Sequence, residues 1–225
     1  MTWDPGGDEA SKAERYDAWF DTPWGRYAWA LESDLVGERL GPGADRLVLD
    51  VGCGTGQSAA VARALGARVV GLDPDPSMLA AARRHRRVDA PVLAVGERLP
   101  FRDRAVDATI AVTVLEFVDD PAAVIAEMAR VTRSPGTVVV GVLNPRSAWG
   151  LWHRRELRGP PWTDARFLTG AALTRLAAPH GTVTVDETLH APGMLPGLAR
   201  WGPGAERMAR RARVPGAFRV VTIER

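Results

Sequence analysis

The sequence predicts an α/β fold with a doubly wound sheet of seven mostly parallel strands, an antiparallel last strand, and helices on both faces. Two observations support this prediction. Short apolar, β-branched runs alternate with helical segments along most of the 225 residues, which is typical of parallel strands joined by right-handed crossovers. The first of these runs ends in an acid and a glycine-rich turn, as strands do where a helix of a βαβ unit begins.

The first part of the chain, residues 8–40, is predicted to be helical. Tyr16, Trp19 and Phe20 recur at helical spacing, and Pro23 divides this part into two helices. Glycine and proline at positions 41–43 end it.

Strands and helices then alternate up to residue 143. We expect strands at about 46–51, 67–72, 91–95, 106–114 and 137–143, the last entered by a turn at Ser134-Pro135-Gly136. Helices are expected at about 56–65, from Met78 to Arg87, and after Asp120. Asp75-Pro76 and Asp120-Pro121 each place a capping carboxyl before a proline at the first helical position.

The composition changes beyond Asn144, where tryptophan, proline and arginine become frequent. Thr169 is expected to cap a helix that ends near His180. Residues 183–189 alternate like a strand, and residues 217–223 form a last strand paired antiparallel with it. We interpret the chain as one domain with four parts: a helical lid (1–43), a core (44–143), insertions with a helix and a sixth strand (144–216), and the last strand (217–225).

Composition and charge exclude several classes of protein. Hydrophobic residues make up 46% of the chain, no apolar run approaches the ~20 residues of a membrane span, and residues 1–8 lack the pattern of a secretion signal. The net charge of +2 does not indicate a nucleic-acid partner. One cysteine and four scattered histidines indicate neither a disulfide nor a metal site. We therefore expect a cytoplasmic monomer or homodimer that binds a small molecule and no metal.

The glycine-rich turn predicts the site of a cofactor. It reads Asp50-Val51-Gly52-Cys53-Gly54-Thr55-Gly56, and helix N-termini present free N–H groups to electron-rich ligands. Asp73 ends the next apolar run, about 20 residues after Gly52, which is the spacing of an acid that holds a ribose diol in a Rossmann-like βαβ unit. The pattern therefore indicates a nucleoside-bearing cofactor, and Cys53 is interpreted as a small residue in a tight turn.

This stretch resembles motif I of the class I S-adenosylmethionine (SAM)-dependent methyltransferases. Its glycines follow G-x-G-x-G and not the dinucleotide pattern G-x-G-x-x-G. The resemblance extends to the stretch from Gly71 to Leu79 and to the turn from Arg133 to Gly136. Glu97-Arg98-Leu99-Pro100-Phe101, followed by Asp107, resembles a segment of the small-molecule group that includes ubiquinone- and menaquinone-type enzymes.

The resemblance implies SAM as cofactor and S-adenosylhomocysteine (SAH) as product. In that family the acid at Asp50 lies near the methionine amino end, the acid at Asp73 holds the ribose, and the residue at Met78 packs under the adenine. In that family the helix that carries Tyr16 folds over the cofactor. Alternatively, its aromatic side chains only pack this helix against the rest of the domain, and the two roles are compatible. The expected cofactor-binding residues are Asp50, Gly52, Cys53, Gly54, Gly56, Asp73, Pro74, Met78, Glu97, Arg98, Val114 and Tyr16.

One position departs from the family pattern. An aspartate that binds the adenine amino group often stands two residues before the glutamate, and here that position is Val95. Either the backbone at Glu97-Arg98 binds the adenine instead, or adenine recognition is looser.

The acceptor is expected outside the carboxyl ends of the strands. Methyl transfer from a sulfonium is a displacement, in which the protein aligns the acceptor behind the methyl group. Glu116, after the fourth strand, is the first candidate for a general base or an acceptor-orienting group, and His153 is the second. For both Glu116 and His153 the alternative is a solvated surface residue with no catalytic role. One wall of the pocket is expected from Asn144, Ser147, Trp149, Trp152 and His153.

The leading function is methyl transfer from SAM to an unidentified small-molecule acceptor. A non-catalytic SAM-binding protein is the first alternative, because Val95 departs from the family and no base is obvious. A nucleotide-dependent oxidoreductase is opposed by the glycine spacing and by Asp50. An RNA-modifying methyltransferase is opposed by Leu115-Glu116-Phe117, where enzymes acting on nucleobase amino groups carry N/D-P-P-Y/F.

Overall fold

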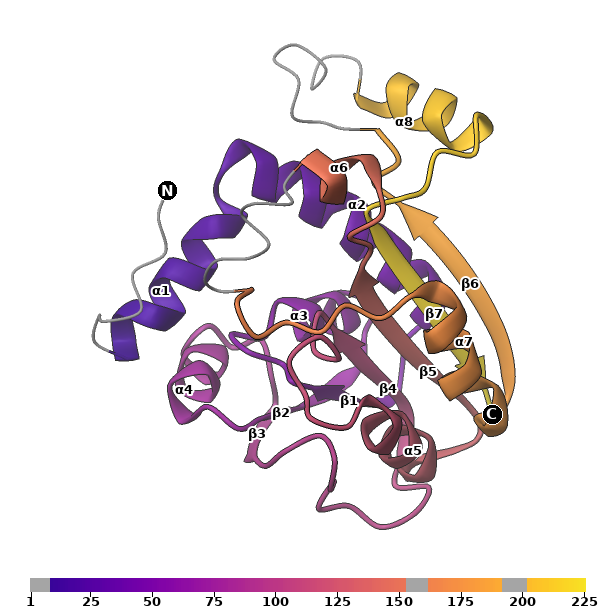
Figure 1. Cartoon of the computed structure of the whole chain (residues 1–225). Coiled ribbons are helices and arrows are strands. Elements are labelled where there is room, and N and C mark those ends of the chain that lie inside the picture. Colours follow the sequence, from indigo (N-terminus) through magenta and orange to yellow (C-terminus); the bar gives the residue numbers. More distant parts are fainter. Residues whose placement is uncertain (1–8, 153–161, 192–201) are drawn as a thin grey trace.

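The computed structural model describes residues 9–152, 162–191 and 202–225 (Figure 1). Its centre is a seven-stranded sheet in the order β3-β2-β1-β4-β5-β7-β6. The strands are β1 (Leu47–Val51), β2 (Arg68–Asp73), β3 (Ala90–Leu93), β4 (Val106–Val112), β5 (Thr132–Leu143), β6 (Thr182–Thr188) and β7 (Phe218–Glu224). Strand β7 is antiparallel to its neighbours β5 and β6, and the pairs from β3 to β5 are parallel. The predicted fold class is confirmed.

The helices include those expected from the sequence and two that were not. They are α1 (Glu9–Phe20), α2 (Pro23–Leu40), α3 (Gln57–Ala64), α4 (Pro76–Arg84), α5 (Pro121–Val131), α6 (Ala148–Trp152), α7 (Gly170–Ala177) and α8 (Gly202–Arg211). Helix α6 has only five residues, too few for a periodic pattern. Helix α8 was missed because it lies in a segment rich in proline and glycine, although residues 205–211 favour helices. No helix in the described ranges is long and apolar enough to cross a membrane.

The sheet separates two hydrophobic cores, as the alternation of side chains along a strand requires. Val48 belongs to the core shared with α2 and α3, whereas its neighbour Leu49 belongs to the core shared with α5 and α7. Helices α5 and α7 lie in front of the sheet in Figure 1, and α2 lies behind it. Asp50, two residues after Val48, therefore faces α3.

The two predicted proline-associated caps are confirmed. The Asp75 carboxylate accepts hydrogen bonds from the N–H groups of Ser77 and Met78, at 2.9 and 3.4 Å. The Asp120 carboxylate accepts from the N–H groups of Ala122 and Ala123, at 3.0 and 3.1 Å. These caps start α4 and α5 directly after loops at the carboxyl ends of β2 and β4, which fixes the edge where a ligand is expected.

Strand β5 begins earlier than the sequence predicts, at Thr132 instead of Thr137. The expected turn at 134–136 lies inside the strand, where the register with β4 shifts from Val106↔Thr132 to Ala108↔Thr137. The turn is therefore a bulge within one strand. The local sequence did not reveal this bulge, because proline and glycine disfavour a strand. Here β4 pairs with β5 both before and after these residues.

Candidate functional site

The glycine turn lies against the end of β4. Gly52 has a positive φ of 68°, and a β-carbon built on it would lie 2.5 Å from Cγ2 of Val114. Any side chain at position 52 would therefore be both strained and in collision with Val114. Bare backbone is required where the ends of β1 and β4 meet.

Asp50 is a buried acid with spare hydrogen-bonding capacity. It is fully buried, and one carboxylate oxygen accepts a hydrogen bond from the Ser58 hydroxyl at 2.7 Å. The other oxygen, Oδ1, is buried without a partner. Burial, with a smaller contribution from the charge of Asp73, raises the pKa of Asp50 to about 7, although the Ser58 bond opposes this change. An unpaired buried acceptor is costly, so this oxygen is suited to a donor group of a ligand.

Asp73 connects the end of β2 to the glycine turn. One of its oxygens accepts from the Gly54 N–H at 2.8 Å, and the other accepts from the Asp75 N–H at 2.8 Å. Each oxygen retains a further lone pair, so the carboxylate can still receive two hydroxyl groups. Burial raises its pKa, while these two hydrogen bonds and the nearby Lys12 oppose the rise. This carboxylate is therefore held in place before any ligand arrives.

Helix α1 is fastened over the glycine turn by polar contacts. The Asp17 carboxylate accepts hydrogen bonds from the Thr55 hydroxyl at 2.5 Å and the Gln57 amide at 3.0 Å. It also forms an ion pair with Arg87 at 2.9 Å, and Lys12 forms an ion pair with Asp75. The helix is therefore fastened to the end of the glycine turn and to the loop after β2.

Tyr16 of α1 lies close to the glycine turn. Its ring lies 3.9 Å from the point where a β-carbon on Gly54 would stand. Burial, followed by the charges of Glu32, Asp50, Asp17 and Asp73, raises the pKa of its hydroxyl. The Tyr16 ring therefore lies beside the glycine turn, with 36% of the residue exposed.

The other residues expected at the cofactor have varied surroundings. Gly56 begins α3 with a positive φ of 86°. Cys53 is 4% exposed, and burial raises the pKa of its thiol, which argues against a nucleophile. Met78 packs with Ala13 of α1 in a small buried cluster. Pro74 and Arg98 are exposed, and the Glu97 carboxylate accepts from the Asp119 N–H at 3.2 Å. Their contacts with a cofactor stay predictions.

The chain turns sharply after β4. Thr113 adopts a positive φ of 53°, an uncommon conformation for a β-branched residue, and its N–H donates to the Gly141 carbonyl at 2.8 Å. Strained backbone of this kind is enriched at functional sites. The turn directs Val114 onto the glycine turn and carries the chain on to Glu116.

Glu116 is buried, so the alternative of a solvated residue is wrong. It is 1% exposed, and its Oε1 accepts from the Leu143 N–H at 2.8 Å. Its Oε2 is buried without a partner. Burial raises the pKa of Glu116 to about 7, in spite of the Leu143 bond.

Glu32 of α2 was not predicted as a site residue. It is 7% exposed, and burial together with the charge of Glu116 raises its pKa to about 8. The buried residues of α2 include Ala28, Glu32, Val36 and Leu40, at four-residue spacing. A single acid within an otherwise apolar helical stripe is a signal that the sequence offered.

The wall expected after β5 is only partly available to a ligand. The Asn144 amide donates to the Gly216 carbonyl at 3.0 Å, and the Ser147 hydroxyl accepts from the Gly150 N–H at 3.0 Å. These side chains hold the local structure. His153, the second catalytic candidate, lies outside the described residues.

An aromatic segment that sequence analysis did not place covers the end of β4. The rings of Phe117 and Trp162 stack at 5.6 Å between centroids, and Trp162 also contacts Phe167. The Arg166 N–H donates to the Glu116 carbonyl at 2.7 Å. Residues 162–167 therefore lie over the loop that carries Glu116.

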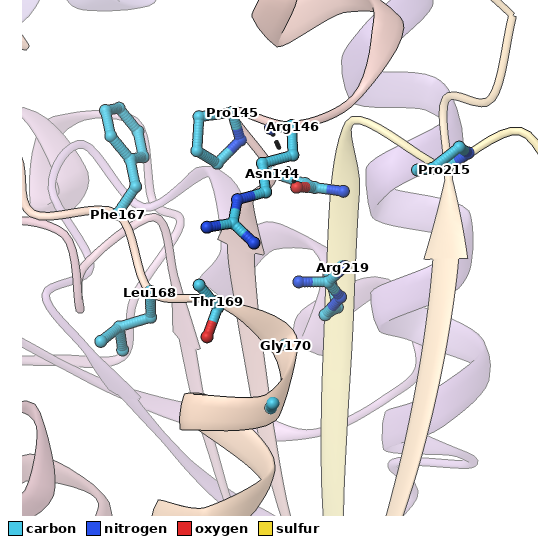
Figure 2. A pocket seen from close by; sticks show the side chains of 10 residues that line it. Asn144, Pro145, Arg146, Phe167, Leu168, Thr169, Gly170, Pro215 and Arg219 are labelled. Carbon is cyan, nitrogen blue, oxygen red and sulfur yellow. Dashed lines mark hydrogen bonds between the residues drawn. The ribbon is translucent and has the colours of Figure 1, made fainter.

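A separate pocket of about 570 Å³ opens beside the end of β5. Figure 2 shows Arg146 above the first turn of α7, with Arg219 nearby on β7. Arg219 is already paired with Glu187 at 2.5 Å, whereas Arg146 is exposed. Within the described ranges, no group of three or more His, Cys, Asp or Glu residues is placed to hold a metal ion.

Comparisons with known proteins show which family this chain belongs to. A family model described as a methyltransferase domain matches residues 49–140. The chain is 38% identical over 176 residues to the malonyl-[acyl-carrier protein] O-methyltransferase of Serratia marcescens, covering 75% of this chain and 68% of that protein. An uncharacterized protein of Mycobacterium tuberculosis is 39% identical over 193 residues, which cover 84% of this chain. The chain spans 64% of the length of that mycobacterial relative.

A solved structure from Thermotoga maritima has a similar fold over nearly the whole length. It is described as a SAM-dependent methyltransferase and a possible histamine N-methyltransferase. The two share 25% identity with a TM-score of 0.74, and the match covers 96% of each chain.

Proposed function

The chain belongs to the class I SAM-dependent methyltransferases, and from this premise we propose that it methylates a small-molecule acceptor held beyond the carboxyl ends of β4 and β5. SAM is the methyl donor and SAH is the product. The observation that supports this proposal best is the arrangement around the glycine turn. There Asp50, Asp73 and the bare backbone of Gly52 face one region under α1.

The residues of this region fit SAM. The unpaired Oδ1 of Asp50 suits a donor such as the cofactor's ammonium group, and Asp73 has lone pairs for two ribose hydroxyls. Gly52 lets the turn pass against Val114, which a side chain at this position would prevent. Bound SAM supplies an electrophilic methyl group, and the chain's own residues hold the cofactor, exclude water and align the acceptor.

Binding of the cofactor is the first test. We expect calorimetric titration to show micromolar affinity for SAM and SAH and no binding of NAD. Asp73→Asn removes the negative charge and half of the acceptor capacity, so we expect the Kd for both sulfur compounds to rise at least tenfold. Asp103→Asn is the matched control, because Asp103 is 75% exposed in its ion pair with Arg130.

Binding of NAD in place of SAM and SAH would contradict the proposed function. Binding of SAM with no transfer of radiolabelled methyl to any acceptor would favour a non-catalytic SAM-binding protein. Unchanged affinity in Asp73→Asn, with the variant folded by circular dichroism, would remove the proposed role of Asp73.

The relatives are named for different acceptors, so they do not indicate the acceptor of this chain. The Serratia relative is named for a malonyl group on a carrier protein, and the Thermotoga structure is described as possibly acting on histamine. These acceptors differ in charge and in the atom that receives the methyl group. We therefore take only the reaction, and not the acceptor, from these proteins.

A further inference from the structure

The pocket beside the end of β5 has a positively charged lining. The loop after β5 supplies Arg146, the start of α7 supplies Thr169 and Gly170, and β7 supplies Arg219. Of the ten described residues that line the pocket, two are arginines and none is an acid. A cavity of about 570 Å³ with such a lining is large enough for a small molecule and favours one that carries negative charge.

The two arginines differ in their partners. Arg219 donates to the Glu187 carboxylate from Nε at 2.8 Å and from Nη2 at 2.5 Å, so its charge is neutralised within the protein. The side chain of Arg146 is exposed and has no ion-pair partner among the residues that the structure describes. The pocket therefore carries one uncompensated positive charge, which belongs to Arg146.

The start of α7 brings the two guanidinium groups to one side of the pocket. A β-carbon on Gly170 would lie 2.8 Å from Cζ and Nη1 of Arg219, so this guanidinium group lies against the first turn of the helix. Figure 2 shows the guanidinium group of Arg146 extending from the loop after β5 toward Thr169. The flat guanidinium group matches a carboxylate, which it can bind through two parallel hydrogen bonds. Arg146 is therefore placed to hold an acid group inside the pocket.

The rest of the lining is apolar and partly aromatic. Phe167 lines the pocket together with Leu168 and two prolines. The ring of Phe167 lies 6.1 Å from that of Trp162, which stacks on Phe117 in the loop after β4. Aromatic rings bind other aromatic rings through large apolar contacts with a defined geometry. The lining therefore suits a ligand that has a flat apolar body beside its acid group.

The pocket adjoins the place where the acceptor is expected. It includes Asn144, which directly follows Leu143, and the Leu143 N–H donates to Glu116 at 2.8 Å. In the sheet, β4 separates β5 from β1 and its glycine turn, so the pocket lies about 10 Å from that turn at the usual strand spacing. A molecule whose acid group is bound at Arg146 can therefore extend one aromatic ring toward the cofactor.

We propose that this pocket binds a carboxylate of the acceptor, so that the substrate is a small aromatic acid anchored by Arg146 and methylated at another atom. This inference rests on the proposed function. The attacking atom gives an electron pair to the methyl carbon, and the bond from that carbon to sulfur breaks with its electron pair left on sulfur. The proton of the attacking group goes to water. A cationic acceptor would instead meet the unpaired charge of Arg146.

Calorimetric titration of the SAH-loaded protein tests this inference without turnover. The probes are 3-phenylpropanoate, its uncharged isostere 3-phenylpropanamide, and hexanoate, which has the acid group without the ring. We expect 3-phenylpropanoate to bind at least about tenfold more tightly than the amide, because only the acid pairs with Arg146. We expect it to bind at least about threefold more tightly than hexanoate, because only the aromatic probe has a ring to place against Phe167.

Two variants should remove the preference for the acid over the amide. Arg146→Gln deletes the uncompensated charge. Ala171→Glu places a competing carboxylate in the pocket, at an exposed position in the first turn of α7 where an acid suits the helix. Ala171→Gln and Arg175→Gln are the matched controls and should keep the preference, since Arg175 is exposed in the last turn of the same helix and does not line the pocket.

The outcomes separate this inference from the proposed function. Equal affinities of wild type for the acid and the amide would overturn the inference, and so would a preference that persists in Arg146→Gln. Hexanoate binding as tightly as 3-phenylpropanoate would overturn the aromatic class of the substrate. Absence of SAH binding in wild type would contradict the proposed function instead. The same titrations in the protein without SAH would then decide whether the pocket binds an aromatic acid, because its lining comes from the chain alone.

Discussion

Replacing Glu116 by glutamine should stabilise the protein at alkaline pH. The glutamine side chain would keep an oxygen that accepts the Leu143 N–H, and it has no charge to bury. The wild-type carboxyl has a pKa near 4.5 when unfolded and about 7 when folded. The variant therefore isolates the free-energy cost of one buried ionisation.

The sign follows from the direction of the pKa change. Between these two pKa values the folded chain holds a proton that the unfolded chain has lost, so wild-type stability falls as pH rises. Above pH 7 the full cost is present and amounts to about 3 kcal/mol. In a chain of this size that difference corresponds to about 6–12 °C in melting temperature.

Urea unfolding of both proteins at about pH 5 and about pH 8.5 measures this difference. We expect the stability of Glu116→Gln relative to wild type to increase by about 3 kcal/mol between the two pH values. Glu38→Gln, changed at an exposed position, should alter stability by about 0.5 kcal/mol or less at either pH. Parallel changes in wild type and Glu116→Gln would refute the reasoning, because Glu116 would then ionise equally well in the folded and unfolded chains.

Three further predictions concern the same structure. In Glu116→Gln the pKa of Glu32 should fall below its value of about 8, because the charge of Glu116 is removed. Carbon-detected NMR titration measures this pKa, and an unchanged value would show that Glu116 does not influence Glu32. Gly141→Ala should destabilise the protein by about 2 kcal/mol in urea unfolding, because the new β-carbon would lie 2.4 Å from Cζ of buried Phe218, whereas Gly204→Ala, with open space around it, should have little effect. Asp17→Ala should speed amide hydrogen exchange in α1, because Thr55, Gln57 and Arg87 lose their shared partner. Unchanged exchange rates would show that the aromatic contacts of α1 are enough to keep this helix in place.

The architecture was predictable from the sequence because each of its signals is local. Alternating apolar runs marked the strands, and the carboxyl-proline pairs at Asp75 and Asp120 marked the helix starts with their actual hydrogen bonds. The glycine spacing with Asp50 and Asp73 indicated the cofactor, since a turn of this kind needs specific residues at fixed offsets. The bulge in β5 was not predictable in this way, because strand pairing stabilises it against its local composition.

The buried acids Glu32 and Glu116 show what the sequence alone left undecided. Glu116 was recognisable as a candidate from its position after the fourth strand, yet whether it was solvated or buried depended on segments far away in the chain. Leu143 supplies the N–H that holds it, and residues 162–167 cover its loop. Glu32 lies 84 positions earlier in the chain, and the packing of α2 on the sheet leaves it 7% exposed. Local patterns thus determined the fold and the cofactor turn. The burial of the two carboxyls arises from tertiary packing, because the cost of a charge depends on its distance from water.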